Sequence, residues 1–326
     1  IMSNKIQKVI VRLQEKIKEG QFYEAQQQTR VVAARHVKSK DWASAIDILF
    51  NVAQSLLKAG QGGSGGDLGI MLVDVYKQAE LKPDFSNKSK LVTLLPLFDS
   101  EEPTRKKFIG DMISWSSKYG EYPAGDPDIH HVVGSLLAEE HDVYEAERHL
   151  TLGTRDSPEV FAKLEFEWYL QDDSHTAALY AARVVFAYLL AGNVRDANKS
   201  LQTFTDTLNT ARPQLDVREV KGLSFNLQIY PSIPLLNFLG LLLQAIQKGS
   251  PDIYRNLNQK YSTYIKEVGL WDDTLALIGE LYFEVPRPRK GNPIFDMMGS
   301  IFGGGAAKPQ PKRVGIQETP VADSLD

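Results

Sequence analysis

The sequence contains no cysteine. This absence excludes disulfides, thiolate nucleophiles and cysteine-ligated metal sites, and it is compatible with a reducing cytosol. The most apolar stretch, residues 233–246, is interrupted by Pro234, Asn237 and Gln244 and falls short of the roughly 20 apolar residues that a membrane-spanning helix needs. The first three residues show no charged and then apolar leader, so we expect a cytosolic protein with no direct membrane insertion.

What is present fits a folded protein with an uneven charge distribution. The 326 residues are 43% apolar and 24% charged, which is enough for one large domain or two ordinary ones. The net charge is −4, but nine basic and three acidic groups in residues 1–40 give that end +6 and leave −10 for the remainder. A positive end can steer an acidic partner or nucleic acid, although a solvated helix face has the same composition.

Apolar residues recur at helical spacing along most of the chain and predict an all-α fold. The first helix is expected to begin after Ser3, as N-cap, and to end at Gly20; another is expected between Asp41 and Gly60. Helix starts with a cap, a proline and an acid occur at Ser250 and at Asp126. Further helices are predicted at about 22–38, 68–82, 86–97, 101–119, 127–140, 143–152, 157–171, 175–191, 194–209, 233–248, 251–268 and 271–284.

Several predicted helix starts share an alanine five positions after a turn residue. Small residues at that position let paired helices approach closely, as in tetratricopeptide-type hairpins. The period is irregular, so the pattern favours a degenerate TPR-like α-solenoid, while ordinary helix packing would give nearly the same sequence. The turn residues and alanines are Gly20 with Ala25, Lys40 with Ala45, His141 with Ala146, and Gly192 with Ala197.

One segment reads as β structure. Leu223, Phe225, Leu227 and Ile229 alternate with polar residues, and residues 221–222 offer a turn after residues 215–217. A lone hairpin is not stable in water, so it must lie on helices, and a free strand edge could receive another chain.

The glycine-rich run at residues 62–66 resembles a phosphate-binding loop only superficially. It lacks the Gly-Lys-Ser/Thr ending, and Asp67 would repel phosphate. We expect a flexible inter-helix loop with Asp67 as the N-cap of a helix beginning at Leu68.

We expect no enzymatic activity, no metal and no cofactor. His141, Glu145 and His149 are spaced four apart, but the repeat pattern puts His141 in a turn, and no third ligand or peptidase spacing accompanies them. Adjacent acids such as Asp172-Asp173 are more often caps or solvated charge than catalytic pairs.

Seven motifs together resemble the helical adaptor family of the guided entry of tail-anchored proteins (GET) pathway, also called the fourth Golgi-to-ER traffic protein family. The resemblance covers about residues 5–305. The motifs are EGQFYEA (19–25), SKDWASAID (39–47), GQGGSGGDL (60–68), YPAGDP (122–127), VYEAER (143–148), LGTRDS (152–157) and DMMGSIFGG (296–304).

The resemblance implies a non-catalytic cytosolic scaffold for delivery of tail-anchored proteins to the endoplasmic reticulum. Its N-terminal half, expected at 1–152, would bind the homodimeric targeting ATPase. Its C-terminal half, expected at 153–302 with the β-hairpin, would hold a ubiquitin-like-domain protein that recruits a co-chaperone carrying the client. Residues 294–302 could add one or two helical turns, and the tail at 303–326 is expected to be disordered.

The resemblance also suggests contact residues. On the ATPase side these are Tyr23, Arg30 and Arg35, with Asp67 as a contact that tunes ATP hydrolysis. Packing within the repeat for Tyr23 and solvation for the arginines stay open as alternatives. The residues expected to hold the ubiquitin-like partner, with the local core as the alternative role for part of them, are Leu223, Phe225, Leu227, Ile229, Leu236 and Phe238.

A second class of function is left open by the basic end alone. A helical-repeat protein could use residues 1–40 to bind nucleic acid, but the pI of about 5.9 and the lack of a recognised module weigh against it. We therefore expect no nucleic-acid partner.

Overall fold

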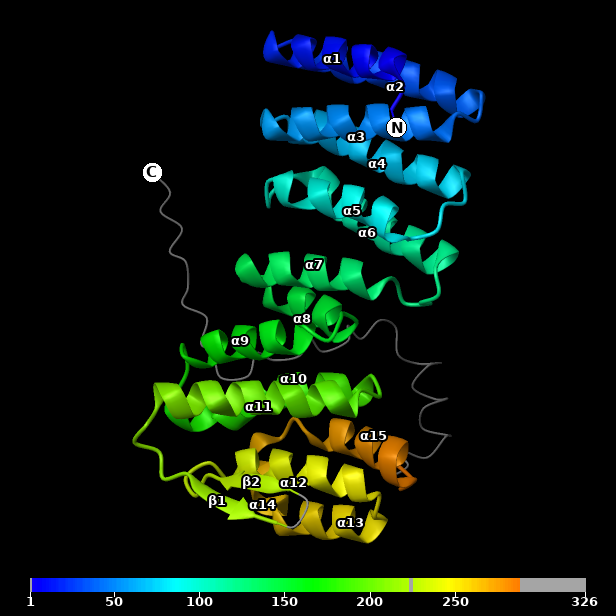
Figure 1. Cartoon of the computed structure of the whole chain (residues 1–326). Coiled ribbons are helices and arrows are strands. Elements are labelled where there is room, and N and C mark those ends of the chain that lie inside the picture. The colour runs from blue at the N-terminus through cyan, green and yellow to red at the C-terminus, as the bar shows by residue number, and fades with distance from the viewer. Residues whose placement is uncertain (1, 223–224, 288–326) are drawn as a thin grey trace, which may run out of the picture. The chain divides into compact units, whose positions relative to one another are not determined.

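The computed structural model describes residues 2–222 and 225–287, and within them the chain is almost entirely helical. These described residues form 15 α-helices, two short 3-10 helices and one two-stranded antiparallel hairpin (Figure 1). The predicted all-α solenoid with one hairpin is thereby confirmed. In these residues no helix is both long and apolar enough to cross a membrane. The expectations for residues 294–302 and for the tail lie outside the described residues.

The chain divides into two compact units at Ser157–Pro158, five residues after the boundary expected from the sequence. In unit 1 each of the first four helices packs against the next helix and the next but one, which is the contact pattern of an α-solenoid (Figure 1). The helices of unit 1 are α1 (Asn4–Lys18), α2 (Phe22–Lys38), α3 (Trp42–Lys58), α4 (Gly62–Gln78), α5 (Phe85–Leu94), η1 (Leu95–Leu97), α6 (Pro103–Tyr119), α7 (Pro127–Glu139) and α8 (Val143–Thr151).

The first four helices end at turns that recur every 20 residues. Gly20, Lys40, Gly60 and Glu80 all have positive φ, between 51° and 78°. Five positions after each of the first three turns comes a buried small residue, which lets the next helix approach its neighbour closely. These residues are Ala25, Ala45 and Gly65. The same spacing joins His141 (φ 60°) to buried Ala146, and Gly192 (φ 75°) to buried Ala197.

The expectation for the glycine run was wrong. Residues 62–66 are the first turns of α4 and not a loop, because the absence of side chains lets α4 pack tightly against α3 and α6. A Cβ on Gly65 would lie 2.7 Å from Leu57 Cγ, and one on Gly66 would lie 1.9 Å from Thr104 Oγ1. Asp67 is therefore inside the helix and caps nothing; Gln61 is at the N-cap position.

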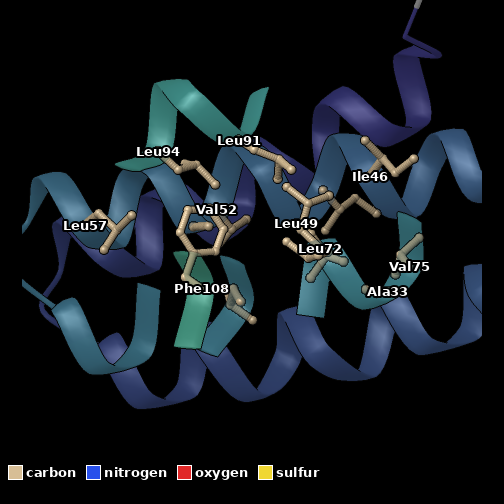
Figure 2. Packing of buried hydrophobic residues seen from close by; sticks show 14 of the residues in the cluster. Ala33, Ile46, Leu49, Val52, Leu57, Leu72, Val75, Leu91, Leu94 and Phe108 are labelled. Atoms are coloured by element: carbon tan, nitrogen blue, oxygen red, sulfur yellow. The ribbon is translucent and has the colours of Figure 1, made fainter. Parts of the chain in front are cut away.

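The core of unit 1 runs through these stacked helices, as Figure 2 shows for Leu49, Leu72 and Phe108. Its largest buried side chain, Trp115, packs 5.0 Å from the ring of Tyr76, and its indole N–H donates to the Leu81 carbonyl at 2.8 Å. Burial of the aromatic rings is the main stabilising contribution here, and the buried donor is satisfied.

Unit 2 continues the helical pattern and holds the hairpin. Residues 251–268 were expected to form one helix but form two, and the break at Tyr261 lets its ring pack 5.6 Å from Phe238. The elements of unit 2 are α9 (Ser157–Tyr169), η2 (Ser174–Thr176), α10 (Ala177–Leu190), α11 (Val194–Ala211), β1 (Arg218–Lys221), β2 (Asn226–Ile229), α12 (Pro234–Lys248), α13 (Pro251–Lys260), α14 (Ser262–Val268) and α15 (Asp272–Phe283).

Candidate partner-binding surfaces

The first candidate surface is the exposed side of α2, the second helix of unit 1. Tyr23 lies in its first turn and is 72% exposed, which decides against packing within the repeat as its role. Arg30 follows two helical turns later, within about 20° of Tyr23 around the helix axis. A large exposed aromatic with an arginine beside it is the composition that protein interfaces favour.

Arg30 is held in place by Asp67 of α4. Its Nη1 donates to Asp67 Oδ2 at 2.5 Å, and Gln26 Nε2 donates to the same oxygen at 2.9 Å. Both partners stay partly exposed, at 44% and 37% of their side chains. Stacking of α2 on α4 brings residues 37 positions apart into contact, which spacing along one helix could not predict. Asp67 therefore contacts α2 of its own chain and orients Arg30.

Arg35 does not share this contact. It lies five residues after Arg30, about 140° around the helix, at the opposite edge of the exposed arc of α2. It is exposed, as are Val31 and Lys38 between the two arginines on that arc. Tyr23, Arg30 and Arg35 thus span the whole width of one solvent-facing surface, called the α2 face below.

Exposed cations on the neighbouring α1 add to the charge of this end of unit 1. Lys5, Lys8 and Arg12 are all exposed, and they recur at spacings of three and four residues along one stripe of the helix. The first turn of α1 carries no acid to complement the helix dipole. The local field at this end is therefore positive although the whole chain is negative.

The second candidate surface is built around the hairpin of unit 2. The register pairs Val220 with Leu227 and Lys221 with Asn226. The predicted turn at residues 221–222 was wrong in position. The Gly222 N–H donates to the Phe225 carbonyl at 2.7 Å, so the reversal lies at residues 222–225 and β1 begins at Arg218. Phe225 is at the turn and not in the strand.

A polar network fixes the hairpin to the helices beneath it. The Asn237 side chain of α12 accepts from Tyr230 N–H at 2.6 Å and donates to the Tyr230 carbonyl at 2.9 Å. The Tyr230 hydroxyl donates to Asn209 of α11 at 2.7 Å and lies 2.9 Å from Gln228 Oε1. Sequence reasoning missed these residues, although Asn237 stood out as a polar interruption of the most apolar run.

The network borders a groove of about 440 Å³ between α11, the hairpin and α12. Leu227 and Leu236 contribute apolar surface to it. Because Gly240 of α12 has no side chain, the Leu227 side chain can lie directly against that helix. Its lining also includes the amides Asn198, Gln202 and Gln244 and the acids Asp206 and Glu219. A groove with both apolar and polar lining can bind an extended or helical peptide.

The six residues expected at this site therefore divide. Leu227 is partly exposed and lines the groove, and Leu236 also borders it but is only 3% exposed. Phe238 is fully buried and packs on Tyr261 and Trp271, so the core alternative holds for Phe238 and for most of the Leu236 side chain. Ile229 is partly exposed at the end of β2 and pairs with Arg218. Leu223 lies outside the described residues.

A buried histidine pair lies elsewhere in unit 1, between α7 and α8. His130 Nδ1 and His149 Nδ1 are 2.9 Å apart, and His130 Nε2 lies 2.8 Å from the Ala124 carbonyl. Because Nε2–H of His130 donates to that carbonyl, its Nδ1 accepts from Nδ1–H of His149, and both rings are neutral. Burial, followed by the proximity of His130 and Arg148, lowers the pKa of His149 to about 4. Burial also lowers the pKa of His130.

The weak metal candidate at His141, Glu145 and His149 does not assemble. His141 is in the turn, as predicted, Glu145 pairs with Arg148 at 2.6 Å, and His149 points to His130. Across residues 2–222 and 225–287 no group of three or more potential ligands could hold a metal ion.

Comparison with known proteins gives one consistent result. The model of the family described as "Golgi to ER traffic protein 4" matches residues 39–302. The Golgi to ER traffic protein 4 of Aspergillus fumigatus is 49% identical over 317 residues, covering 93% of this chain and 92% of its own. The Schizosaccharomyces pombe protein of the same name is 32% identical over 286 residues, covering 86% and 91%.

A solved structure agrees with the sequence matches. The chain described as "Crystal structure of C. therm. Get4" superposes with a TM-score of 0.87 at 51% identity, covering 97% of this chain and 100% of that chain. The chain therefore belongs to the Golgi to ER traffic protein 4 family, which supports a role in Golgi-to-ER traffic.

Proposed function

We propose that the protein is a non-catalytic, cytosolic two-partner adaptor of the GET pathway. Unit 1 binds the homodimeric targeting ATPase through the α2 face, and unit 2 binds a ubiquitin-like-domain protein in the hairpin groove. That second partner recruits the co-chaperone that carries the tail-anchored client. The observation that carries this proposal is that each unit presents its own candidate binding surface, one cationic and one a groove of mixed polar and apolar lining.

The chemistry of the α2 face supports an acidic protein partner. Tyr23 offers a large apolar contact with a polar hydroxyl, and Arg30 and Arg35 can each form paired hydrogen bonds with carboxylates. Arg30 is pre-oriented by Asp67, so less side-chain entropy is lost when it binds. We assign to Asp67 an effect on the ATPase that is transmitted through Arg30.

The chemistry of the hairpin groove supports a peptide segment with apolar anchors. Leu227 and Leu236 would receive such anchors, while the lining amides would bind backbone groups. The network of Asn209, Tyr230 and Asn237 holds the hairpin in place before the partner binds. The hairpin therefore loses little conformational entropy when the complex forms.

Charge reversal of Arg35 is expected to weaken ATPase binding about tenfold and to leave the ubiquitin-like partner unaffected, because loss of one rim ion pair costs about 1.4 kcal/mol. Leu227→Asp should do the opposite, since it places a charge in the groove. Kd values of Arg35→Glu and Leu227→Asp for both partners, measured by biolayer interferometry, test this crossed pattern.

Two matched variants serve as controls for that experiment. Arg255→Glu reverses an exposed arginine of α13, away from both candidate surfaces, and Val220→Asp charges the cross-strand neighbour of Leu227 outside the groove. Both should bind each partner as the unmodified chain does. The two-surface assignment would be contradicted if Arg35→Glu lost equal affinity for both partners. It would also be contradicted if the rate of association with the ATPase did not change with salt concentration.

The assignment of Asp67 can be tested by a double-mutant cycle. Asp67→Ala should weaken ATPase binding when Arg30 is present and should have almost no further effect in an Arg30→Ala background, because Asp67 acts by orienting that arginine. We expect a coupling energy of about 1 kcal/mol, measured as ATPase Kd for the four variants. Additive losses would mean that Asp67 contacts the partner directly.

A further inference from the structure

The last helices of unit 2 leave a groove open beside α15. This cavity has a volume of about 370 Å³ and lies between α13 and α14 on one side and α15 on the other. Tyr254, Ile265 and Leu275 contribute buried apolar surface to its lining. Ala276 of α15 also lines it and is too small to fill it, whereas Gly279 is in close contact with the Tyr254 ring. The groove could therefore receive apolar side chains from another segment.

The chain itself turns toward this groove when it leaves α15. Glu284 has a left-handed conformation (φ 54°), and the Val285 N–H donates to the Gly279 carbonyl at 3.0 Å. This left-handed C-terminal cap reverses the chain direction, so that Val285 and Pro286 line the groove. Arg287 then pairs with Glu280 of α15. The residues that follow start at the edge of the groove.

The sequence that follows contains one apolar cluster with helical spacing. Its members, at i, i+1, i+4, i+7 and i+8, fall on one face of a helix. The linker at 288–293 spans up to about 20 Å, which matches the roughly 18 Å length of α15. The cluster can therefore reach every part of the groove. Its members are Ile294, Phe295, Met298, Ile301 and Phe302.

Charge favours a path of the linker beside α15, and family similarity supports the segment that follows the linker as the occupant. The helix α15 and its cap carry Asp272, Asp273, Glu280 and Glu284 and no basic residue, while residues 287–290 carry three basic residues. The match to the family model also extends to residue 302 and ends just before Gly303-Gly304-Gly305. The segment is thus part of the sequence that the family shares.

We propose that residues 294–302 dock in this groove of their own chain and form the terminal cap of the α13–α15 helices. The last repeat of a solenoid has no following repeat to cover its apolar side, and a capping element with a polar outer face solves this problem. The short tether favours the chain's own segment over a second copy, because it gives an effective concentration in the millimolar range.

The cysteine-free sequence makes this proposal directly testable by crosslinking. The full-length variant Ala276→Cys/Met298→Cys should form an intramolecular disulfide in oxidised glutathione. The matched control, Ala276→Cys/Ser300→Cys, places the second thiol on the opposite face of the same segment. If the segment is not docked, the two pairs should form the intramolecular disulfide at nearly equal rates. If it is docked, the pair with Cys at position 298 should form the disulfide at least about fivefold faster.

The outcomes of this experiment are distinct. A faster intramolecular product for position 298, read by non-reducing electrophoresis and mass spectrometry, supports the proposal. Equal rates for the two pairs overturn it, and so does a predominant disulfide-linked dimer, which would assign the groove to a second copy.

A measurement without introduced thiols provides an independent test. Met298→Asp/Ile301→Asp should increase amide hydrogen exchange in residues 254–279 to the level of a chain ending at residue 287. The control Val321→Asp should leave that exchange unchanged. Unaltered exchange in the double aspartate variant would also overturn the proposal.

Discussion

Gly66→Val is expected to destabilise unit 1 by at least about 3 kcal/mol, at the upper end of what overpacking usually costs. A Cβ at this position would lie 1.9 Å from Thr104 Oγ1 and 2.7 Å from Thr104 Cβ. Thr104 cannot move away freely, because its hydroxyl lies 3.0 Å from Glu102 Oε1 and near the Gly62 carbonyl. Thermal denaturation followed by circular dichroism should show a midpoint lower by about 6–12 °C.

A neighbouring glycine supplies the control. Gly63 is in the same helix turn, but a Cβ there would meet no atom within 4 Å. Gly63→Ala should therefore be neutral or stabilising by up to about 1 kcal/mol, since alanine restricts the unfolded chain and favours helix. If Gly66→Val does not fold, Gly66→Ala with and without Thr104→Ala measures the same clash, and Thr104→Ala should restore part of the loss. An unchanged midpoint for Gly66→Val would refute close packing of α4 on α6.

The histidine pair is expected to make unit 1 sensitive to acid. The pKa of His149 is about 4 in the folded chain against an ordinary value of 6.5, so between these values the unfolded chain binds more protons. The contribution of His149 to the free energy of unfolding should be constant above pH 6.5 and should fall as the pH decreases toward 4. A shift of this size corresponds to about 3 kcal/mol over the whole window.

His149→Asn isolates this contribution, because an amide can still donate to His130 Nδ1 but does not titrate. Urea denaturation at pH 7.0, 6.0 and 5.0 should show a smaller loss of stability on acidification in His149→Asn than in the unmodified chain. His131→Asn is the control, since His131 is only partly buried and bonds Ser157. Identical pH profiles for His149→Asn and the unmodified chain would refute the assignment.

Local sequence signals predicted most of the fold. The spacing of apolar residues, together with caps such as Ser3, Asp126 and Ser250, predicted nearly every helix of the described chain. The turn-plus-five rule also held, and applied to Gly60 it would have pointed to Gly65 as one more small packing residue. The glycine run was predicted to be a loop because glycine has a low helix propensity, which is a local property of the sequence. The close packing that makes this run helical depends instead on contacts of α4 with α3 and α6.

The candidate sites were less predictable because they depend on contacts between distant residues. The pairing of Arg30 with Asp67 arises only when α2 stacks on α4, and the anchoring of Tyr230 by Asn237 requires the hairpin to lie on α12. The position of the turn was missed because the alternation of apolar residues in the sequence begins before β2, and Phe225 belongs to that alternation but precedes the strand. Apolar alternation alone cannot tell a strand from a turn that follows it.

The position of the α2 face on the outermost helices of unit 1 links recognition to folding. Among the described residues α1 packs against α2 and α3, whereas α4 packs against α2, α3, α5 and α6, so this end of the helical array should open before the middle does. A partner bound at the α2 face, as we propose, would add contacts to α1 and α2 and stabilise that end. Part of its binding free energy would then suppress local unfolding of these helices, and amide protection in α1 and α2 should report occupancy of the surface.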